Sequence, residues 1–248
     1  MPAKQTARTN LQGLVKTLLK AAAAFFLPAA AFSQDVISAK AGMINHIEGR
    51  VLLQDERLIE VRPSFLHMEA GQRLRTEDGR AEVLFAVGSY LRLGPHSEVE
   101  MVSAGLTSAS VRLHRGSMIV DAHLVYDEDS LTLLAGDAKV RLLKKGLYRL
   151  DAAEVDGSSL TVVQGDALLV SGDSESTIKK KQSIRFGKPD EAVFESRFKH
   201  WVEDELTAWH EKRASVIAQT TAKVDKRQVQ DDSEILLLLP DRSRANIY

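Results

Sequence analysis

The stretch GQRLRTEDGRAEVLFAVGSYLRLGPHSEVEM, residues 71–101, decides the fold. Within it Ala81, Val83 and Phe85 are apolar, and the residues between them point to the opposite side of an extended chain. A period of two is typical of a β-strand that turns one face toward a core. We therefore predict a strand here whose outward face carries Glu82.

Turn signals divide the stretch into short strands. A glycine–serine pair at 88–89 predicts a two-residue turn, after which Leu91 and Leu93 continue the apolar face. We expect Tyr90 and Arg92, which alternate with them, to face solvent. The glycine–proline pair that follows is a strong strand breaker, so a new strand should begin shortly after it.

The same alternation, punctuated by turn glycines, recurs from residue 42 to residue 187. About ten to twelve short strands at this spacing predict a mainly β fold, either a β-sandwich or an irregular β-roll. We expect the turn and cap residues to have structural roles, because none of them is a reactive group: Gly71, Thr76, Gly79, Gly88, Ser89, Pro95, Gly116, Gly146 and Gly165. The opening stretch is thus interpreted as a scaffold.

After residue 187 the hydrophobic period changes, and residues 190–225 predict an amphipathic helix. Its apolar residues recur at steps of three and four: Phe194, Phe198, Trp201, Val202, Leu206 and Trp209. Both of the chain's tryptophans lie on this stripe. We expect the helix to dock either on its own β-domain or on a partner or second copy, and we take Trp201 and Trp209 as candidate interaction residues.

The N-terminal segment has the pattern of a secretory signal peptide. Basic residues precede the apolar run AAAAFFLPAAAF at 21–32, which is too short to span a bilayer easily. We expect residues 1–33 to be removed, by cleavage after Ser33 or after Ala31; an uncleaved anchor helix is the alternative. Cleavage after Ser33 removes four basic residues and no acidic one, so the net charge changes from −1 to −5. No membrane span would remain.

This reading places the mature protein in the periplasm or outside the cell of a bacterium. The chain has no cysteine, so its stability cannot come from disulfides, and it lacks the cysteine of a lipoprotein. At the other end, residues 226–248 form a polar tail with a short apolar segment at 235–239. That segment could pair with a sheet edge of the same fold, lack fixed structure, or dock on a partner.

Composition and motifs give no sign of catalysis. The near-neutral charge offers no electrostatic footprint for nucleic acid. The closest approach to a metal pair is His200 with Asp204, and the closest carboxylate pair is Glu98 with Glu100; both patterns favour solvated faces. We predict no enzyme activity, no cofactor and no metal site.

The residue pattern resembles that of the FecR-type domain family. The resemblance starts at Gly71-Gln-Arg-Leu-Arg-Thr76 and continues through Gly79, Ala81-Glu82-Val83, Gly88-Ser89, Leu91-Arg92-Leu93, Pro95 and Ser97. "VRLHRGSMIVDA", "KGLYRLDA" and "LTVVQGDALLV" then follow in the family's order, and the resemblance covers residues 42–187.

The resemblance implies a periplasmic sensing or interaction domain. Family members relay iron–siderophore signals to a sigma factor through a cytoplasmic segment and a membrane helix. Because residues 1–33 are basic and expected to be cleaved, we expect this chain to share only the envelope β-domain, as the stand-alone exported members do. We predict a non-catalytic interaction or sensing module whose partner is another envelope protein. A module that binds envelope glycan or peptidoglycan is the alternative, and an envelope hydrolase is less favoured.

Overall fold

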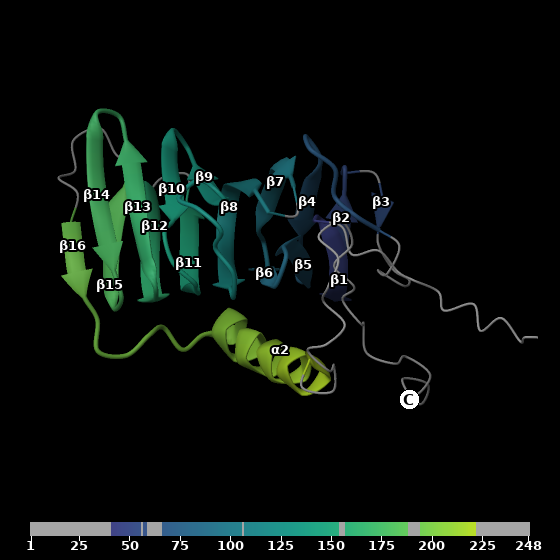
Figure 1. Cartoon of the computed structure of the whole chain (residues 1–248). Helices are drawn as coiled ribbons and strands as arrows, with labels where there is room; N and C mark the ends of the chain where they lie inside the picture. Colours follow the sequence, from purple (N-terminus) through teal and green to yellow (C-terminus); the bar gives the residue numbers. More distant parts are fainter. Residues whose placement is uncertain are drawn as a thin grey trace, which may run out of the picture. The chain divides into compact units, whose positions relative to one another are not determined.

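The computed structural model describes residues 41–55, 57–58, 66–105, 107–153, 157–187 and 194–221. These residues belong to one compact unit. They are mainly β-strands with a helix near the C-terminus, which confirms the predicted fold class (Figure 1). The predicted signal peptide at 1–33 and the predicted tail at 226–248 lie outside the described residues.

The strands form two sheets, A and B, that are joined through one long strand, β8 (Ala109–Ala122). Sheet A contains, in spatial order, β1 (Met43–Glu48), β5 (Arg80–Ala86), β6 (Ser89–Leu93), the second half of β8, β11 (Gly146–Ala153), β12 (Gly157–Gln164), β15 (Gln182–Phe186) and β16 (Phe194–Arg197). Sheet B contains β3 (Arg57–Leu58), β2 (Val51–Leu53), β4 (Arg73–Thr76), β7 (Glu98–Ala104), the first half of β8, β9 (Leu131–Ala135), β10 (Ala138–Leu142), β13 (Asp166–Ser171) and β14 (Ser174–Lys179).

Successive hairpins alternate between the two sheets, which makes the fold a β-roll. From β9 onward the chain forms one hairpin in sheet B, one in sheet A, one in B and one in A. Neighbouring strands are antiparallel except β8 and β9, which run parallel. The described residues hold sixteen strands, more than the ten to twelve expected, because some are very short: β2, β3, β4 and β16 have two to four residues each.

The core lies between the sheets and is apolar. Alternate residues of each strand fill it, as predicted for Ala81, Val83 and Phe85, which are all fully buried. In sheet A the inward set also includes Tyr148 and Leu160. One continuous cluster joins residues from both sheets, so the alternation read from the sequence is the physical basis of the fold.

Gly116 lies where β8 leaves sheet B and enters sheet A. The buried residues of β8 are Val111 and Leu113 before it but Met118 and Val120 after it, so the inward face changes from odd to even positions. This is the effect of one inserted residue, a bulge that bends a strand from one sheet to the other. Gly116 adopts a φ of 85°, a conformation that glycine accepts without steric cost.

Side-chain hydrogen bonds from Ser97, just before β7, and from Thr76, at the end of β4, hold this crossing in place. The Ser97 hydroxyl accepts a hydrogen bond from the amide of Ser117 at 2.9 Å and donates one to the carbonyl of Pro95 at 2.9 Å. The buried Thr76 hydroxyl accepts one from the amide of Ser97 at 2.9 Å and donates one to the carbonyl of Gly94 at 2.5 Å. Thr76 thus joins the turn after β6 to the end of β4.

The predicted start of the C-terminal helix is wrong. Phe194–Arg197 is strand β16, which pairs antiparallel with β15 at the end of sheet A. The helix, α2 (Glu205–Thr221), begins later. Backbone pairing with an otherwise open sheet edge outweighs the helical spacing of the aromatic residues in this segment. Val202, expected on the buried stripe, is 55% exposed before the helix begins.

Replacing Gly116 by alanine should destabilise the protein strongly. A Cβ there would lie 2.1 Å from the Ser97 hydroxyl oxygen and 2.6 Å from the Ser97 Cα. Gly136 has a φ of 55° with nothing near the Cβ position, so it is a matched control. Gly136→Ala should cost about 1 kcal/mol from backbone strain alone. Gly116→Ala should cost about 2–4 kcal/mol, because overpacking adds to the strain. Chemical denaturation measures both, and equal costs would contradict the steric role.

Candidate functional site

Helix α2 lies across the outer face of sheet A, where it contacts β6 and β8 (Figure 1). Leu206 and Trp209 of the helix pack with Ile119 of β8 in a small cluster separate from the main core. Leu147 and Trp201 pack at its margin. We call the contact of α2 and the preceding residues 201–204 with sheet A the α2 interface.

Most of the α2 interface is charged, beginning with a buried ion pair on the sheet. Glu82 of β5 and Arg92 of β6 are cross-strand neighbours, and both have fully buried side chains. The Arg92 Nε donates to Glu82 Oε2 at 2.8 Å, and its Nη1 lies 3.3 Å from Asp121 Oδ2 on β8. Removing such charges from water is costly unless each finds partners.

Helix α2 and strand β1 supply further partners for Glu82. Arg213 Nη2 donates to Glu82 Oε1 at 2.7 Å, and Asn45 of β1 donates to the same oxygen at 2.5 Å. The Glu82 carboxylate therefore receives hydrogen bonds from three side chains on three elements. Burial opposes its ionisation, but the hydrogen bond from Arg213 and the charge of Arg92 outweigh burial and lower the pKa of Glu82.

His210 of α2 must be neutral for the interface to form as it does. The Arg92 Nη1 donates to His210 Nδ1 at 2.7 Å, and a guanidinium cannot accept a hydrogen bond, so Nδ1 carries no proton. Burial first, and then the charge of Arg92, lower the pKa of His210 to about 4, against the raising effects of Asp121 and Glu82. The ring of Trp201 meets the imidazole edge-on at 6.1 Å.

The lowered pKa of His210 makes helix docking sensitive to acid. The free imidazole has a pKa of 6.5, so above this pH His210 is neutral in both states and contributes its full stabilisation to the docked helix. As the pH falls from 6.5 toward 4, this stabilisation is lost, because the undocked helix takes up the proton more readily. The full effect is of the order of 3 kcal/mol, since one pKa unit corresponds to about 1.36 kcal/mol. His46, whose ring stacks on Trp209 at 6.3 Å, acts in the same direction, because burial and then Arg213 lower its pKa.

A second ion cluster fixes the start of the helix. Asp204 Oδ1 accepts a hydrogen bond from the amide of Thr207 at 2.9 Å, the geometry of a helix N-cap. Its Oδ2 lies 2.6 Å from Arg149 Nη1 on β11, so one carboxylate caps the helix and binds the sheet. Burial opposes ionisation, but the Thr207 amide and Arg149 outweigh it and lower the pKa of Asp204. Arg149 also pairs with Asp151 at 2.9 Å.

The outer face of sheet A continues beyond α2 into an open hollow of about 490 Å³. The residues that line it are small or charged: Gly116, Ser117, Asp151, Ala152, Ala153, Gly157, Ser158, Ser159 and Arg185. The Ser117 hydroxyl donates to Asp151 at 2.6 Å, and Asp151 in turn contacts Arg149 under the helix start. The polar surface is therefore continuous from the covered part to the open part.

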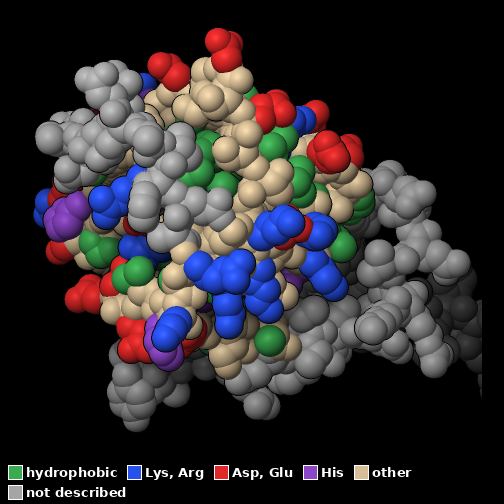
Figure 2. All heavy atoms as spheres, turned by 90° about the vertical axis from the view of Figure 1, so that its left-hand side faces the viewer, with side chains coloured by type: hydrophobic (Ala, Val, Ile, Leu, Met, Phe, Trp, Pro, Cys, Tyr) green, Lys and Arg blue, Asp and Glu red, His purple; other side chains and the backbone are tan. Residues whose placement is uncertain are grey.

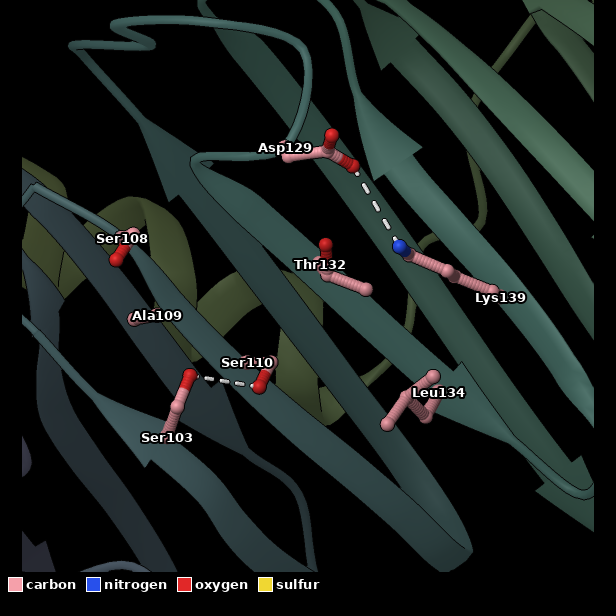
Figure 3. A pocket seen from close by; sticks show the side chains of 8 residues that line it. All are labelled: Ser103, Ser108, Ala109, Ser110, Asp129, Thr132, Leu134 and Lys139. Atoms are coloured by element: carbon pink, nitrogen blue, oxygen red, sulfur yellow. Dashed lines mark hydrogen bonds and ion pairs between the residues drawn. The ribbon is translucent and has the colours of Figure 1, made fainter.

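A second hollow, of about 440 Å³, lies on sheet B (Figure 3). Its lining residues are Ser103, Ser108, Ala109, Ser110, Asp129, Thr132, Leu134 and Lys139, none of them aromatic. The hydroxyls of Ser103 and Ser110 bond each other at 2.8 Å, and Lys139 lies 3.5 Å from Asp129. The polar groups here are thus partly engaged with one another.

The predicted site residues are distributed between the turns and the α2 interface. Trp209 is 3% exposed and Trp201 half-buried, and both contact residues of the α2 interface. The predicted structural residues lie at turns, strand ends and the β8 crossing rather than in the interface: Gly71, Thr76, Gly79, Gly88, Ser89, Pro95, Gly116, Gly146 and Gly165.

The expectation that Arg92 faces solvent is wrong. For this reason the sequence does not predict the main part of the site, the charged network around Arg92. Arg92 does point away from the core, but α2 covers it completely. The sequence does place Glu82 and Arg92 on outward positions. What it does not show is that their strands pair in register and that His210 and Arg213 lie above them.

The two pairs considered for metal or catalytic chemistry are engaged otherwise. His200 is exposed, whereas Asp204 binds Arg149. Glu98 and Glu100 face outward and pair with basic side chains of sheet B: Arg73, Arg115 and His114. Among the described residues, no group of three or more histidine or acidic side chains is placed to hold a metal ion. In the same part of the chain, no helix is long and apolar enough to cross a bilayer.

Known protein families and curated proteins give no match to this chain. Two solved structures resemble it, both of a candidate anti-sigma factor from Parabacteroides distasonis. The first, at 1.65 Å resolution, is 15% identical, covers 59% of this chain and 72% of that one, and has a TM-score of 0.45. The second, at 2.50 Å, is 16% identical, covers 65% and 80%, and has a TM-score of 0.44. Both likenesses are distant.

Replacing Glu82 by glutamine should weaken the α2 interface sharply. The change keeps the shape but leaves Arg92 and Arg213 buried without their shared counter-charge, which costs about 3–5 kcal/mol. The control is Glu77→Gln, whose partner Arg50 is 61% exposed, and such a surface pair is worth about 1 kcal/mol or less. Chemical denaturation, monitored by tryptophan fluorescence, measures the stability of the interface directly, because both tryptophans lie in it. Equal effects of the two changes would show that the buried network does not hold α2.

Proposed function

We propose that this chain is a non-catalytic protein-interaction module of the bacterial cell envelope. The outer face of sheet A is its recognition surface, and α2 occupies part of that surface in the chain itself. The observation that carries the proposal is the α2 interface, in which a helix is held by Arg92, Glu82, His210 and Arg213 together with two tryptophans.

The composition of this contact is that of a recognition interface. The main core of the protein is a continuous apolar cluster between the sheets. The α2 interface instead combines tryptophan and arginine with buried ion pairs, and these two residue types are enriched where proteins recognise one another. Contacts of this polar kind between parts of one chain resemble transient interfaces between proteins.

The recognition surface is larger than the part that α2 covers. The hollow lined by Ser117, Ser159 and Arg185 continues the polar face past the start of the helix. A partner can therefore engage the open part while α2 is docked, and displace α2 afterwards. The segment between β16 and α2 has no regular structure, so it places no strand pairing in the way of such a movement.

The groups with shifted pKa values support binding rather than catalysis. Shifted values mark catalytic sites or structural ion-pair networks. Glu82 accepts hydrogen bonds from Asn45, Arg92 and Arg213, and Asp204 is shared between a helix cap and Arg149. The lowered pKa values of Glu82 and Asp204 therefore have a structural cause in partners that are already in contact.

The location in the envelope rests on the predicted signal peptide. We propose that residues 1–33 direct export and are removed, so that the module acts in the periplasm or outside the cell. The partner is then another envelope protein.

Site-specific photo-crosslinking in bacterial cells that export the full chain tests this function. A photoreactive residue at Ser159 lies on the open part of sheet A, and one at Thr177 lies on the edge strand β14 of sheet B as the control. We expect a discrete adduct from the Ser159 position alone, in the envelope fraction. The yield should rise when Trp209→Ala loosens α2, because helix and partner compete for one face.

Two outcomes would contradict the proposal. One is the absence of a discrete adduct at Ser159 while the protein is folded and exported. The other is the same adduct from Ser159 and Thr177, since a partner recognised by sheet A does not touch both.

A further inference from the structure

Exposed cations gather at one end of the roll. They come from the β10–β11 turn, the end of β14 with the β14–β15 turn, and the end of β16: Lys144, Lys145, Lys179, Lys180, Lys181, Arg197 and Lys199. Figure 2 shows lysine and arginine side chains gathered on this side of the molecule. Within the described residues, the one ion pair of this group joins Lys144 to Asp166. We call the group the lysine cluster.

Backbone pairing holds the three segments of the lysine cluster together. Lys179 lies opposite Asp166 in the β13–β14 ladder, beside the turn that carries Lys144. The Lys181 carbonyl accepts a hydrogen bond from the amide of Phe198 at 3.2 Å, and Gln182 lies opposite Arg197. These ladders keep like charges close in spite of their repulsion, so the concentration of charge is a fixed property of the fold.

The turn at the centre of the cluster is occupied by lysine against backbone preference. Lys181 has a φ of 65°, in the left-handed region where glycine or asparagine is the usual residue. Its amide donates to the Val162 carbonyl at 2.7 Å, so pairing with β12 imposes this conformation. Lysine is not the residue that this turn conformation favours, but it adds a positive charge to the surface.

The shape and chemistry of this end suit a broad anionic surface. Six of the seven cations are lysines, which act as point charges on flexible stems and lack the planar fork with which arginine grips a single phosphate. None of them lines either hollow described above. An array of turn lysines outside these two hollows matches a layer of headgroups better than one small anion or a folded acidic domain.

Exposed apolar residues accompany the charges. Val202, three residues after Lys199, is 55% exposed, and Leu124 is 46% exposed. Ala122 lies between Ser89 and Gly146 at this end of sheet A, and the Leu124 side chain lies against Gly88 in the β5–β6 turn. Basic side chains beside apolar ones are the combination with which proteins adsorb to the headgroup region of a bilayer.

From these observations we infer that the lysine cluster attaches the protein to anionic lipid bilayers through their phosphate headgroups. The chain as a whole has a net charge of −1, so it has no overall attraction to such a surface, and the lysine cluster supplies a local one. None of these residues lines the hollow with Ser117, Ser159 and Arg185, so attachment here leaves that hollow free for a partner. The inference does not depend on the proposed protein-binding function.

Vesicle sedimentation with the full chain tests the inference. The vesicles contain phosphatidylcholine alone, or phosphatidylcholine with phosphatidylglycerol. The test variant carries Lys179→Gln, Lys180→Gln and Lys181→Gln. The control variant carries Arg73→Gln, Arg115→Gln and Lys139→Gln on sheet B, which changes the net charge equally. Because the N-terminal segment is the same in all proteins, its own affinity for lipid cancels in the comparison.

We expect the unaltered chain to bind the anionic vesicles at low salt and to be released as salt screens the charges. The test variant should bind at least about tenfold more weakly, and the control variant less than about threefold, because only the cluster lies at the surface. Far-ultraviolet circular dichroism confirms that each variant is folded.

Four results would overturn the inference. Three of them are equal binding to neutral vesicles, equal losses in the two variants, and tighter binding of soluble polyglutamate than of vesicles. The last would assign the cluster to an acidic polypeptide. Inorganic phosphate at constant ionic strength should displace the protein no better than chloride, and a stronger effect would indicate a site for a single phosphate instead of a lipid surface.

Discussion

The structure depends on how the ion pair between Glu82 and Arg92 is covered. The roll itself is an apolar core between two sheets, but its outer face carries two opposite charges with fully buried side chains. Such a pair is tolerable because α2 completes it: Arg213 binds Glu82, and His210 accepts from Arg92. Without the helix, both charges would be open to water and to any other polypeptide that offers the same groups.

The same network explains why the contact between α2 and sheet A is only moderately stable. The Arg92 Nη2 has no hydrogen-bond partner within the described residues, and an unmet donor of this kind reduces the stability of its surroundings. The apolar part of the contact is small, essentially Leu206 and Trp209 against Ile119. A helix held mainly by polar contacts can be exchanged for a partner at a lower cost than one embedded in the core. In our proposals, the lysine cluster attaches the protein to a lipid surface, and the outer face of sheet A recognises the partner.

Much of the scaffold could be predicted from the sequence, because it follows from local rules. Alternation along residues 81–85 fixed the inward face, and the turn glycines marked the ends of strands. The bulge at His114, just before Gly116, could not be predicted, since it appears only when β8 is seen to cross between sheets. The segment at Phe194–Arg197 was read as helix, because an edge strand in sheet A offers pairing that no local pattern reveals. The candidate site was the least predictable part: its charges come from β5, β6, β8 and α2, and only their pairing brings them together. The tryptophans were the one sequence signal that pointed to it.

The most direct test of this account is an acid titration followed by two signals, tryptophan emission for α2 and far-ultraviolet circular dichroism for the sheets. His210 faces Arg92, Asp121, Glu82 and His123, and its pKa is lowered from 6.5 to about 4, whereas hydrogen bonding to Arg213 and the charge of Arg92 lower the pKa of Glu82 and so favour its charged form. Between pH 6.5 and 4.5 the account therefore predicts that emission shifts to longer wavelength while the β-sheet signal stays constant. His210→Gln, whose side-chain oxygen can still accept from Arg92, should remove most of that shift. An emission that stays unchanged over this range, or that changes only together with the β-sheet signal, would contradict the claim that a neutral His210 and its ion network hold the helix on the sheet.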